Sequence, residues 1–313
     1  MLTLDPRLQA YLDKLRERPG FDWRNTVEDA RRMFWKQAHA LETDAPAMLE
    51  TRTLKVSGAD GPLDARLYVP FAAGAGAGPG IVFFHGGGFV LGDLDSHEML
   101  CRRLADAGRL RVLSVAYRLA PEHRFPAAPE DAVAATQWAH AHADAIGFDP
   151  ARMGVAGDSA GGNLAAVVAQ QSKARALAPL KAQILIYPCT QFLQMTPSQI
   201  RLKEGYMLTQ AAQDFFRDKY LPSREDALDT RCSPLLENDL GGLPPAYIVT
   251  AGFDPLLDEG KAYAEKLEAC GVRVTYREYA GQIHGFFNMT AISSEARRAV
   301  ADAGVWAAGV LGA

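Results

Sequence analysis

The segment GDSAG at residues 157–161 places a serine where it could act as a nucleophile. It follows the apolar run 151–157 and precedes a helical stretch at 161–173, so we expect a strand that turns directly into a helix. The glycines of the segment let that strand and that helix approach each other closely. At the apex of this turn, Ser159 is predicted to project above the sheet with its hydroxyl free to attack.

A serine hydroxyl is a weak nucleophile near neutral pH and needs a base that accepts its proton. In proteins with this type of turn, the acid and then the histidine follow the serine along the chain. Six of the seven histidines precede Ser159, which leaves His284 as the predicted base. His284 lies in the segment AGQIHGFF, just beyond the strand-like run 272–279.

The acid that orients His284 is predicted from its position in the chain. Asp254 follows the strand-like run AYIVTAG, whose carboxyl end should lie where the serine turn also opens. Asp258 and Glu259 are the alternatives, but they fall in the next helix, which is a poorer place from which to reach the imidazole. We therefore assign Asp254 the role of orienting His284 and stabilising its imidazolium form.

The segment HGGG at residues 85–88 supplies candidate donors for the negative charge that develops on a substrate carbonyl. Successive glycines allow bare backbone N–H groups to face that oxygen. The N–H groups of Gly87 and Gly88, together with that of Ala160 after the serine, are predicted to form an oxyanion hole. His85 is expected to anchor this loop by hydrogen bonding and not to ionise.

These residues require a scaffold of alternating strands and helices. From about residue 50 the chain shows short β-branched runs separated by amphipathic stretches, which is typical of a mostly parallel sheet covered by helices on both faces. The strand-like runs are 63–70, 81–85, 111–118, 151–157, 181–188, 246–252 and 272–279, and the helical stretches lie near 96–107, 128–146, 161–173 and 257–270.

Two segments depart from this alternation. Residues 1–48 have the pattern of helices without a strand, and Asn25 or Thr26 is a suitable N-cap for one of them. Residues 190–222 interrupt the alternation and contain a helix-like stretch for which Thr209 is a suitable N-cap. Both segments must cover some part of the sheet domain.

Composition and charge argue against several function classes. The chain has 313 residues and a net charge of −4, which gives no basic footprint for nucleic acid or for an anionic membrane. No signal-peptide pattern and no terminal stretch long enough to span a membrane are present, so we expect a cytoplasmic protein. The four cysteines are scattered without a CxxC pair, and residues 157–164 lack the lysine of a phosphate loop, so we predict no metal and no cofactor.

Several motifs together resemble the hormone-sensitive-lipase family of α/β-hydrolases, which includes bacterial carboxylesterases. They are HGGGF, YRLAPEHRFPAAPED, GDSAGGN, DPLLDEG and IHGF, and the resemblance covers roughly residues 50–290. It implies an eight-stranded, mostly parallel sheet with a helical cap built from the N-terminus and from an insert after the sixth strand. We accordingly expect a catalytic α/β-hydrolase domain at 49–313 and a cap at 1–48 and 189–222.

The resemblance also implies a reaction, which is the hydrolysis of short- to medium-chain acyl esters without a cofactor. Many relatives form dimers through the last strand, which is 272–279 here. Hydrolysis of amides, carbamates or lactones by the same triad is an alternative. A non-catalytic receptor for a small ligand is another, since plant gibberellin receptors share this fold, but those receptors lack the histidine that is present here as His284.

Large apolar side chains of the two cap segments are candidates for the wall of an acyl pocket. These are Phe34, Trp35, Met207 and Phe215. Ordinary packing within the cap is the alternative for each of them.

Overall fold

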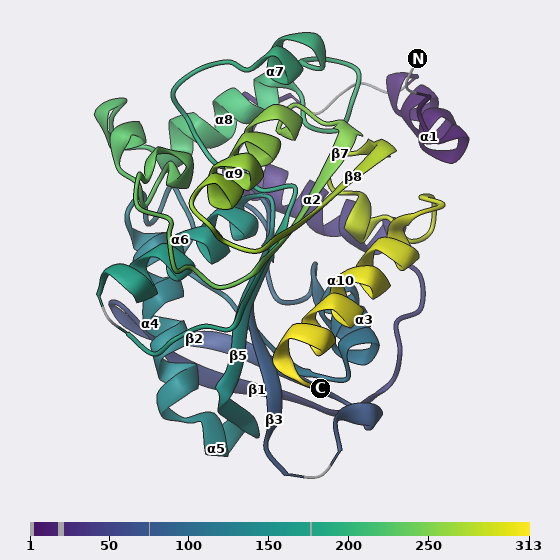
Figure 1. Cartoon of the computed structure of the whole chain (residues 1–313). Coiled ribbons are helices and arrows are strands. Elements are labelled where there is room, and N and C mark those ends of the chain that lie inside the picture. The colour runs from purple at the N-terminus through teal and green to yellow at the C-terminus, as the bar shows by residue number, and fades with distance from the viewer. Residues whose placement is uncertain (1–2, 18–21, 75, 176) are drawn as a thin grey trace.

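The computed structural model describes residues 3–17, 22–74, 76–175 and 177–313. Within these ranges eight strands form one twisted sheet (Figure 1). Their spatial order is β1 (Met48–Gly58), β2 (Gly61–Pro70), β4 (Arg111–Val115), β3 (Gly78–Phe84), β5 (Phe148–Asp158), β6 (Ala182–Ile186), β7 (Ala246–Phe253) and β8 (Val274–Ile283). β2 is antiparallel to both of its neighbours, and all the other pairs are parallel.

Helices flank the sheet and also lie beyond the carboxyl ends of its parallel strands (Figure 1). They are α1 (Pro6–Arg16), α2 (Val27–Leu41), α3 (Glu98–Gly108), α4 (Ala127–Ala141), α5 (Ala143–Ile146), α6 (Ala160–Ala174), α7 (Pro197–Arg201), α8 (Gln210–Tyr220), α9 (Leu257–Ala269) and α10 (Ala296–Leu311). Short 3-10 turns lie at Phe71–Ala73, Glu225–Leu228, Pro234–Leu236 and Phe286–Asn288.

The central strand β3 shows why the sheet needs cover on both faces. Successive residues of a strand point to opposite faces, and every side chain of β3 is buried. Ile81 and Phe83 pack in one core with residues of α3 and α10. Val82 and Phe84 pack in the other core with residues of α4 and α6. A parallel strand buried on both sides is therefore an unbroken apolar run, as its sequence predicts.

The predicted fold class is confirmed, with strand boundaries that shift by a few residues. The sequence pattern does not locate β1, because β1 is an edge strand in which Val56 is the one buried side chain. It also does not locate α10. Two of the predicted caps are present, since Thr26 accepts a hydrogen bond from the Asp29 N–H and Thr209 accepts one from the Ala212 N–H.

Strand direction brings three segments of the chain to one edge of the sheet. β5, β7 and β8 run parallel, so their carboxyl ends lie at the same edge. Ser159, Asp254 and His284 each directly follow one of these strands. In the described part of the chain, no helix combines the length and the apolar character needed to cross a membrane.

Candidate active site

The turn between β5 and α6 holds Ser159 in an unusual backbone conformation. Its φ is 55° and its ψ is −115°, values that a residue other than glycine rarely adopts. The turn is tight because its glycines lack side chains: a Cβ on Gly161 would collide with the carbonyl oxygen of Phe84, and one on Gly157 would collide with that of Gly161. The serine side chain consequently projects above the sheet, as the sequence predicts.

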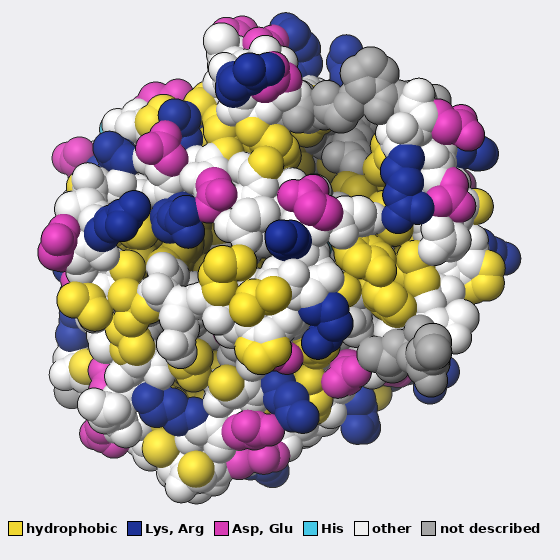
Figure 2. Space-filling model, turned by 90° about the horizontal axis from the view of Figure 1, so that it is seen from above, with side chains coloured by type: hydrophobic (Ala, Val, Ile, Leu, Met, Phe, Trp, Pro, Cys, Tyr) yellow, Lys and Arg dark blue, Asp and Glu magenta, His cyan; other side chains and the backbone are white. Residues whose placement is uncertain are grey.

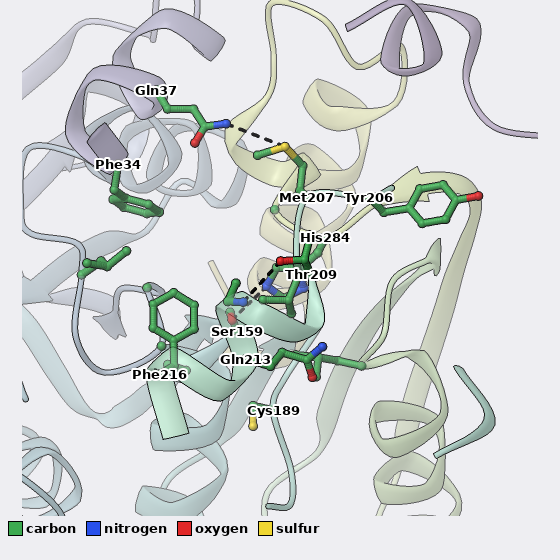
Figure 3. Close-up of a pocket in the computed structure, with 18 of the residues that line it drawn as sticks. Phe34, Gln37, Ser159, Cys189, Tyr206, Met207, Thr209, Gln213, Phe216 and His284 are labelled. Carbon is green, nitrogen blue, oxygen red and sulfur yellow. Dashed lines mark hydrogen bonds between the residues drawn. The ribbon is translucent and has the colours of Figure 1, made fainter. Parts of the chain in front are cut away.

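Ser159, His284 and Asp254 form a continuous chain of hydrogen bonds, of which Figure 3 shows Ser159 and His284. The Nε2 atom of His284 lies 2.9 Å from Oγ of Ser159, and its Nδ1 atom lies 2.7 Å from Oδ2 of Asp254. Asp254 is fully buried, and its Oδ1 accepts a hydrogen bond of 2.9 Å from the Leu256 N–H. A carboxylate that accepts from Nδ1–H leaves the lone pair of Nε2 directed at the serine hydroxyl.

The two alternative acids have other partners. Oδ2 of Asp258 accepts a hydrogen bond of 2.7 Å from the Ser198 N–H, at the start of α7. Glu259 is buried beneath the segment that follows β6, and its Oε1 accepts a hydrogen bond of 2.7 Å from the Thr190 N–H. Burial raises the pKa of Glu259 to about 8. The structure therefore brings Asp254 to His284 and directs the two other acids toward residues 190–199.

The HGGG loop lies beside the serine. Gly87 and Gly88 have φ values of 114° and 62°, which favour glycine, and both residues line the same cavity as Ser159 and Ala160. A Cβ on Gly88 would collide with the ring of Phe216. Ala160 is the first residue of α6, so its N–H has no acceptor within that helix. This arrangement leaves backbone N–H groups near the serine for a developing oxyanion.

A buried polar network supports this loop from behind. Oδ1 of Asp158 accepts a hydrogen bond of 2.8 Å from the Gly86 N–H and lies 3.3 Å from Nε2 of His97. Burial acts to raise the pKa of Asp158, but His97 and these hydrogen bonds bring it below its usual value. His85 is buried with Nδ1 2.8 Å from the carbonyl oxygen of Gly86, and burial lowers the pKa of His85 to about 4. His85 is thus neutral near pH 7, in keeping with an anchoring role.

Residues 81–288 match the protein family described as alpha/beta hydrolase fold. The chain belongs to this α/β-hydrolase family. Carboxylic ester hydrolase LipN of Mycobacterium tuberculosis (strain ATCC 25618 / H37Rv) is 44% identical over 295 residues, which cover 92% of this chain and 78% of LipN. Ethyl acetate hydrolase of Pseudomonas putida is 40% identical and is covered to 86%, as is this chain. The predicted resemblance to the hormone-sensitive-lipase family is confirmed by these matches.

Solved structures agree with this assignment. A hyperthermophilic esterase from the archaeon Pyrobaculum calidifontis superposes with a TM-score of 0.95 at 39% sequence identity. The superposition covers 99% of this chain and 100% of that esterase. Because the superposition spans almost the whole chain, it includes the segments at 1–48 and 189–222 in addition to the sheet.

The α/β-hydrolase contains a large cavity of about 1210 Å³ that reaches Ser159 and His284. Its wall includes Phe34 and Gln37 of α2, Met207 before α8, and Phe216 of α8 (Figure 3). Apolar side chains dominate the wall, and the charged side chains from the cap segments that contribute to it are Arg16, Lys36, Glu204 and Arg217. Seen from above, the molecule shows hydrophobic side chains gathered in patches with acidic and basic ones scattered between them (Figure 2).

The cavity wall contains two of the four candidate lining residues. Phe34 and Met207 line the cavity, but Trp35 and Phe215 do not. Consecutive helical residues point about 100° apart, so only one residue of each aromatic pair faces inward. Trp35 is 44% exposed and its ring lies on that of His39, at a centroid distance of 3.9 Å.

Phe215 is buried in the cap, where its ring packs against that of Trp23 at a centroid distance of 5.2 Å. Its neighbour Phe216 lines the cavity instead. The sequence contains the signal that could separate the two faces of α2, because Phe34, Gln37 and Leu41 recur at helical spacing and all line the cavity. For α8 the adjacent phenylalanines leave that choice open.

Among the residues that the structure describes, no group of three or more His, Cys, Asp or Glu side chains is arranged to hold a metal ion. Cys101, Cys189, Cys232 and Cys270 are free thiols. Burial raises the pKa of Cys101, Cys189 and Cys232, so these three stay protonated near neutral pH.

Proposed function

We propose that this α/β-hydrolase is a serine carboxylesterase that cleaves short- to medium-chain acyl esters through an acyl-enzyme. The observation that carries the proposal is the hydrogen-bonded chain from Asp254 through His284 to Ser159, at the floor of a largely apolar cavity. The relatives support it, because LipN is named a carboxylic ester hydrolase and the Pseudomonas putida protein an ethyl acetate hydrolase.

In the acylation half of the reaction, Oγ of Ser159 forms a bond to the ester carbonyl carbon while its proton passes to Nε2 of His284. The carbonyl oxygen becomes an oxyanion, which the N–H groups of Gly87, Gly88 and Ala160 stabilise. The bond between the carbonyl carbon and the alcohol oxygen then breaks. The imidazolium of His284 donates its proton to that oxygen, so a neutral alcohol leaves and the acyl group stays on the serine.

In the deacylation half, water takes the place of the alcohol. His284 accepts a proton from water, and the resulting hydroxide oxygen bonds to the acyl carbon. The bond to Oγ of Ser159 breaks, and His284 returns the proton to the serine. Asp254 remains ionised throughout and stabilises the imidazolium at both stages.

We further assign residues 49–313 to the catalytic domain and residues 1–48 and 189–222 to a cap. In support, α1, α2, α8 and the segment after β6 all contribute side chains to the cavity above Ser159. Phe34 and Met207 are the predicted substrate-contacting residues that this assignment retains. Limited proteolysis with and without a bound phosphonate ester tests it, since a cap that covers the ligand should be protected first.

A homodimer through β8 is proposed as well. β8 is the last strand of the sheet, so the backbone groups of its outer edge have no neighbouring strand in the described chain. A second copy could pair there and continue the sheet. Sedimentation velocity over a wide range of concentration tests this, and the cytoplasmic location stays a prediction.

The experiment that tests the reaction is hydrolysis of a panel of p-nitrophenyl esters from acetate to octanoate, alongside the matching anilides. We expect turnover of the esters, with little turnover of the anilides, and loss of both in S159A. Since Ser159 supplies the attacking atom, an S159A variant with full esterase activity contradicts the proposal.

A further inference from the structure

Glu259 is a buried carboxyl group that the proposed reaction does not use. It lies in the first turn of α9, five residues beyond Asp254, and is 1% exposed. A buried carboxyl group must find hydrogen-bond donors or destabilise the fold. Its partners therefore indicate which part of the molecule it holds in place.

The hydrogen-bond partners of the Glu259 carboxyl group lie in the segment that follows β6 and in α7. Oε1 accepts a hydrogen bond of 2.7 Å from the Thr190 N–H. Oε2 accepts from Nε2 of Gln191 at 3.3 Å and from Nε2 of Gln199 at 3.1 Å. Thr190 adds a second link, because its hydroxyl donates to the Glu259 carbonyl oxygen at 3.0 Å.

The orientation of both glutamine amides follows from their other contacts. Oε1 of Gln191 accepts two backbone N–H groups, at 2.8 and 3.0 Å. Oε1 of Gln199 accepts the Thr196 N–H at 2.9 Å. A backbone N–H can only donate, so each amide oxygen must face the backbone and each amide nitrogen must face Glu259. Glu259 is thus a common acceptor for two glutamine side chains and for the backbone of this segment.

The segment that Glu259 holds forms one wall of the cavity. The lining residues between β6 and α7, and within α7, are Cys189, Gln191, Phe192, Leu193, Gln194, Met195 and Gln199. Residues 190–196 contain no helix or strand, so their path depends on side-chain contacts such as these. Glu259 lies behind the wall, opposite the side that a substrate would touch.

We propose that Glu259 is a positioning residue that sets the chain-length selectivity of the enzyme by fixing the cavity wall at residues 190–199. The inference rests on the proposed esterase function and deepens it. Glutamine at position 259 has nearly the same shape, but its NH₂ group cannot accept a hydrogen bond, whereas both oxygens of a carboxyl group keep lone pairs that can accept, whether or not one of them carries a proton. In E259Q the NH₂ group therefore faces another donor, either the Thr190 N–H or the amide nitrogens of Gln191 and Gln199. The hydrogen bonds on that side are lost, and residues 190–199 are held less firmly.

The test is the selectivity of E259Q for esters of different length. One series varies the acyl group, from p-nitrophenyl acetate to p-nitrophenyl octanoate. The other varies the alcohol group, from methyl acetate to octyl acetate, so that selectivity for each half of the ester is measured separately. We expect kcat/KM for the longest ester of one series to fall on the order of tenfold relative to the shortest. An unchanged ratio in both series, or an equal loss for all the esters, overturns the inference.

A matched control separates this effect from general loss of stability. Tyr263 is buried in the same helix, and its hydroxyl accepts a hydrogen bond of 3.0 Å from Nε2 of Gln170, away from the wall. Y263F should lower the melting temperature and leave the ratio between long and short esters unchanged. If Y263F changes the ratio as much as E259Q does, the effect belongs to stability and the inference fails.

If E259Q does not fold, a second variant tests the same inference. Q199M removes one donor to Glu259 but leaves the carboxyl group intact, and it should shift the ratio in the same direction. The two proposals also fail separately. No turnover of any ester by the unmodified protein contradicts the proposed function, whereas turnover with an unchanged ratio in E259Q and Q199M contradicts only the role of Glu259.

Discussion

Nδ1 of His284 lies 2.7 Å from Oδ2 of Asp254, although the two residues are 30 positions apart in the chain. They meet because Asp254 follows β7, His284 follows β8, and these strands are parallel neighbours. Strand order therefore creates the contact between the acid and the base. The contact also fixes the proton of the imidazole on Nδ1 of His284, which leaves Nε2 free to accept from Ser159.

D254N should lower kcat on the order of 10⁴-fold, because it reverses the tautomer of His284. In the unmodified protein, Asp254 accepts hydrogen bonds from both Nδ1 of His284 and the Leu256 N–H. Asparagine has one acceptor oxygen, which the Leu256 N–H requires, so its NH₂ faces Nδ1. The imidazole proton then moves to Nε2, which can no longer accept from Ser159. Steady-state hydrolysis of p-nitrophenyl butyrate measures the loss.

D258N is the matched control for that experiment. Asp258 lies four residues further on and binds the Ser198 N–H, with no hydrogen bond to the imidazole. We expect D258N to retain kcat within a few-fold and to change the stability of α7 instead. A loss of kcat in D258N equal to that in D254N would mean that the acid has been wrongly assigned.

The losses from removing Ser159 and His284 should not add. S159A removes the attacking oxygen, after which the base has nothing to activate, and H284A leaves a protonated alcohol. Each single variant should lose on the order of 10⁴–10⁶ in kcat, and the double variant should be about as inactive as either one. Single-turnover hydrolysis of p-nitrophenyl butyrate provides the comparison. Logarithmic losses that sum would show that the two residues act independently.

Local patterns in the sequence predict the sheet and the chemistry of the site well. The residues of β3 and β7, and residues 153–157 of β5, are mainly apolar because both faces of the sheet are covered there, and this leaves a clear signal. Ser159 and the HGGG loop are equally visible, since glycine is needed where the backbone of the turn is crowded or has positive φ. His284 is found by elimination, because every other histidine precedes the serine.

Features that depend on contacts between distant segments of the chain cannot be predicted from local sequence patterns. β1 lies at the edge of the sheet and most of its side chains are exposed, so its sequence lacks the apolar run of a central strand. Phe215 and Phe216 are chemically identical, and which of them faces the cavity depends on how α8 is rotated against Trp23 and Gly88. The partners of Glu259 likewise follow from the path of a segment without regular structure.

M207W should shorten the preferred acyl chain. Met207 lines the cavity and contacts Gln37, whose Nε2 lies 3.7 Å from its sulfur, so a larger side chain there fills space above the serine. The ratio of hexanoate to acetate turnover should fall several-fold, because a blocked pocket excludes only the longer group. W35A serves as the control: Trp35 points outward, and its loss should leave the ratio unchanged. Equal losses for both esters in M207W would show that Met207 only packs the cap.

The contribution of Glu259 to stability should decline as the pH rises. Its pKa is about 8 in the folded protein, because of burial, and about 4.3 in an unfolded chain. Between these values the folded state holds a proton that the unfolded state has released, so raising the pH favours unfolding. The contribution is fully present below about pH 4.3 and is lost as the pH rises through about 8.

E259Q carries an amide that does not titrate, so it lacks this dependence. The gap in melting temperature between the unmodified protein and E259Q should therefore be largest near pH 5 and should narrow toward pH 9. Other titrating groups affect both proteins equally and cancel in the difference. Y263F is the control, because its gap should stay constant over the same range. A gap for E259Q that is constant or widens with pH would mean that Glu259 is already ionised in the folded protein at pH 5, with the hydrogen bonds from Thr190, Gln191 and Gln199 outweighing its burial.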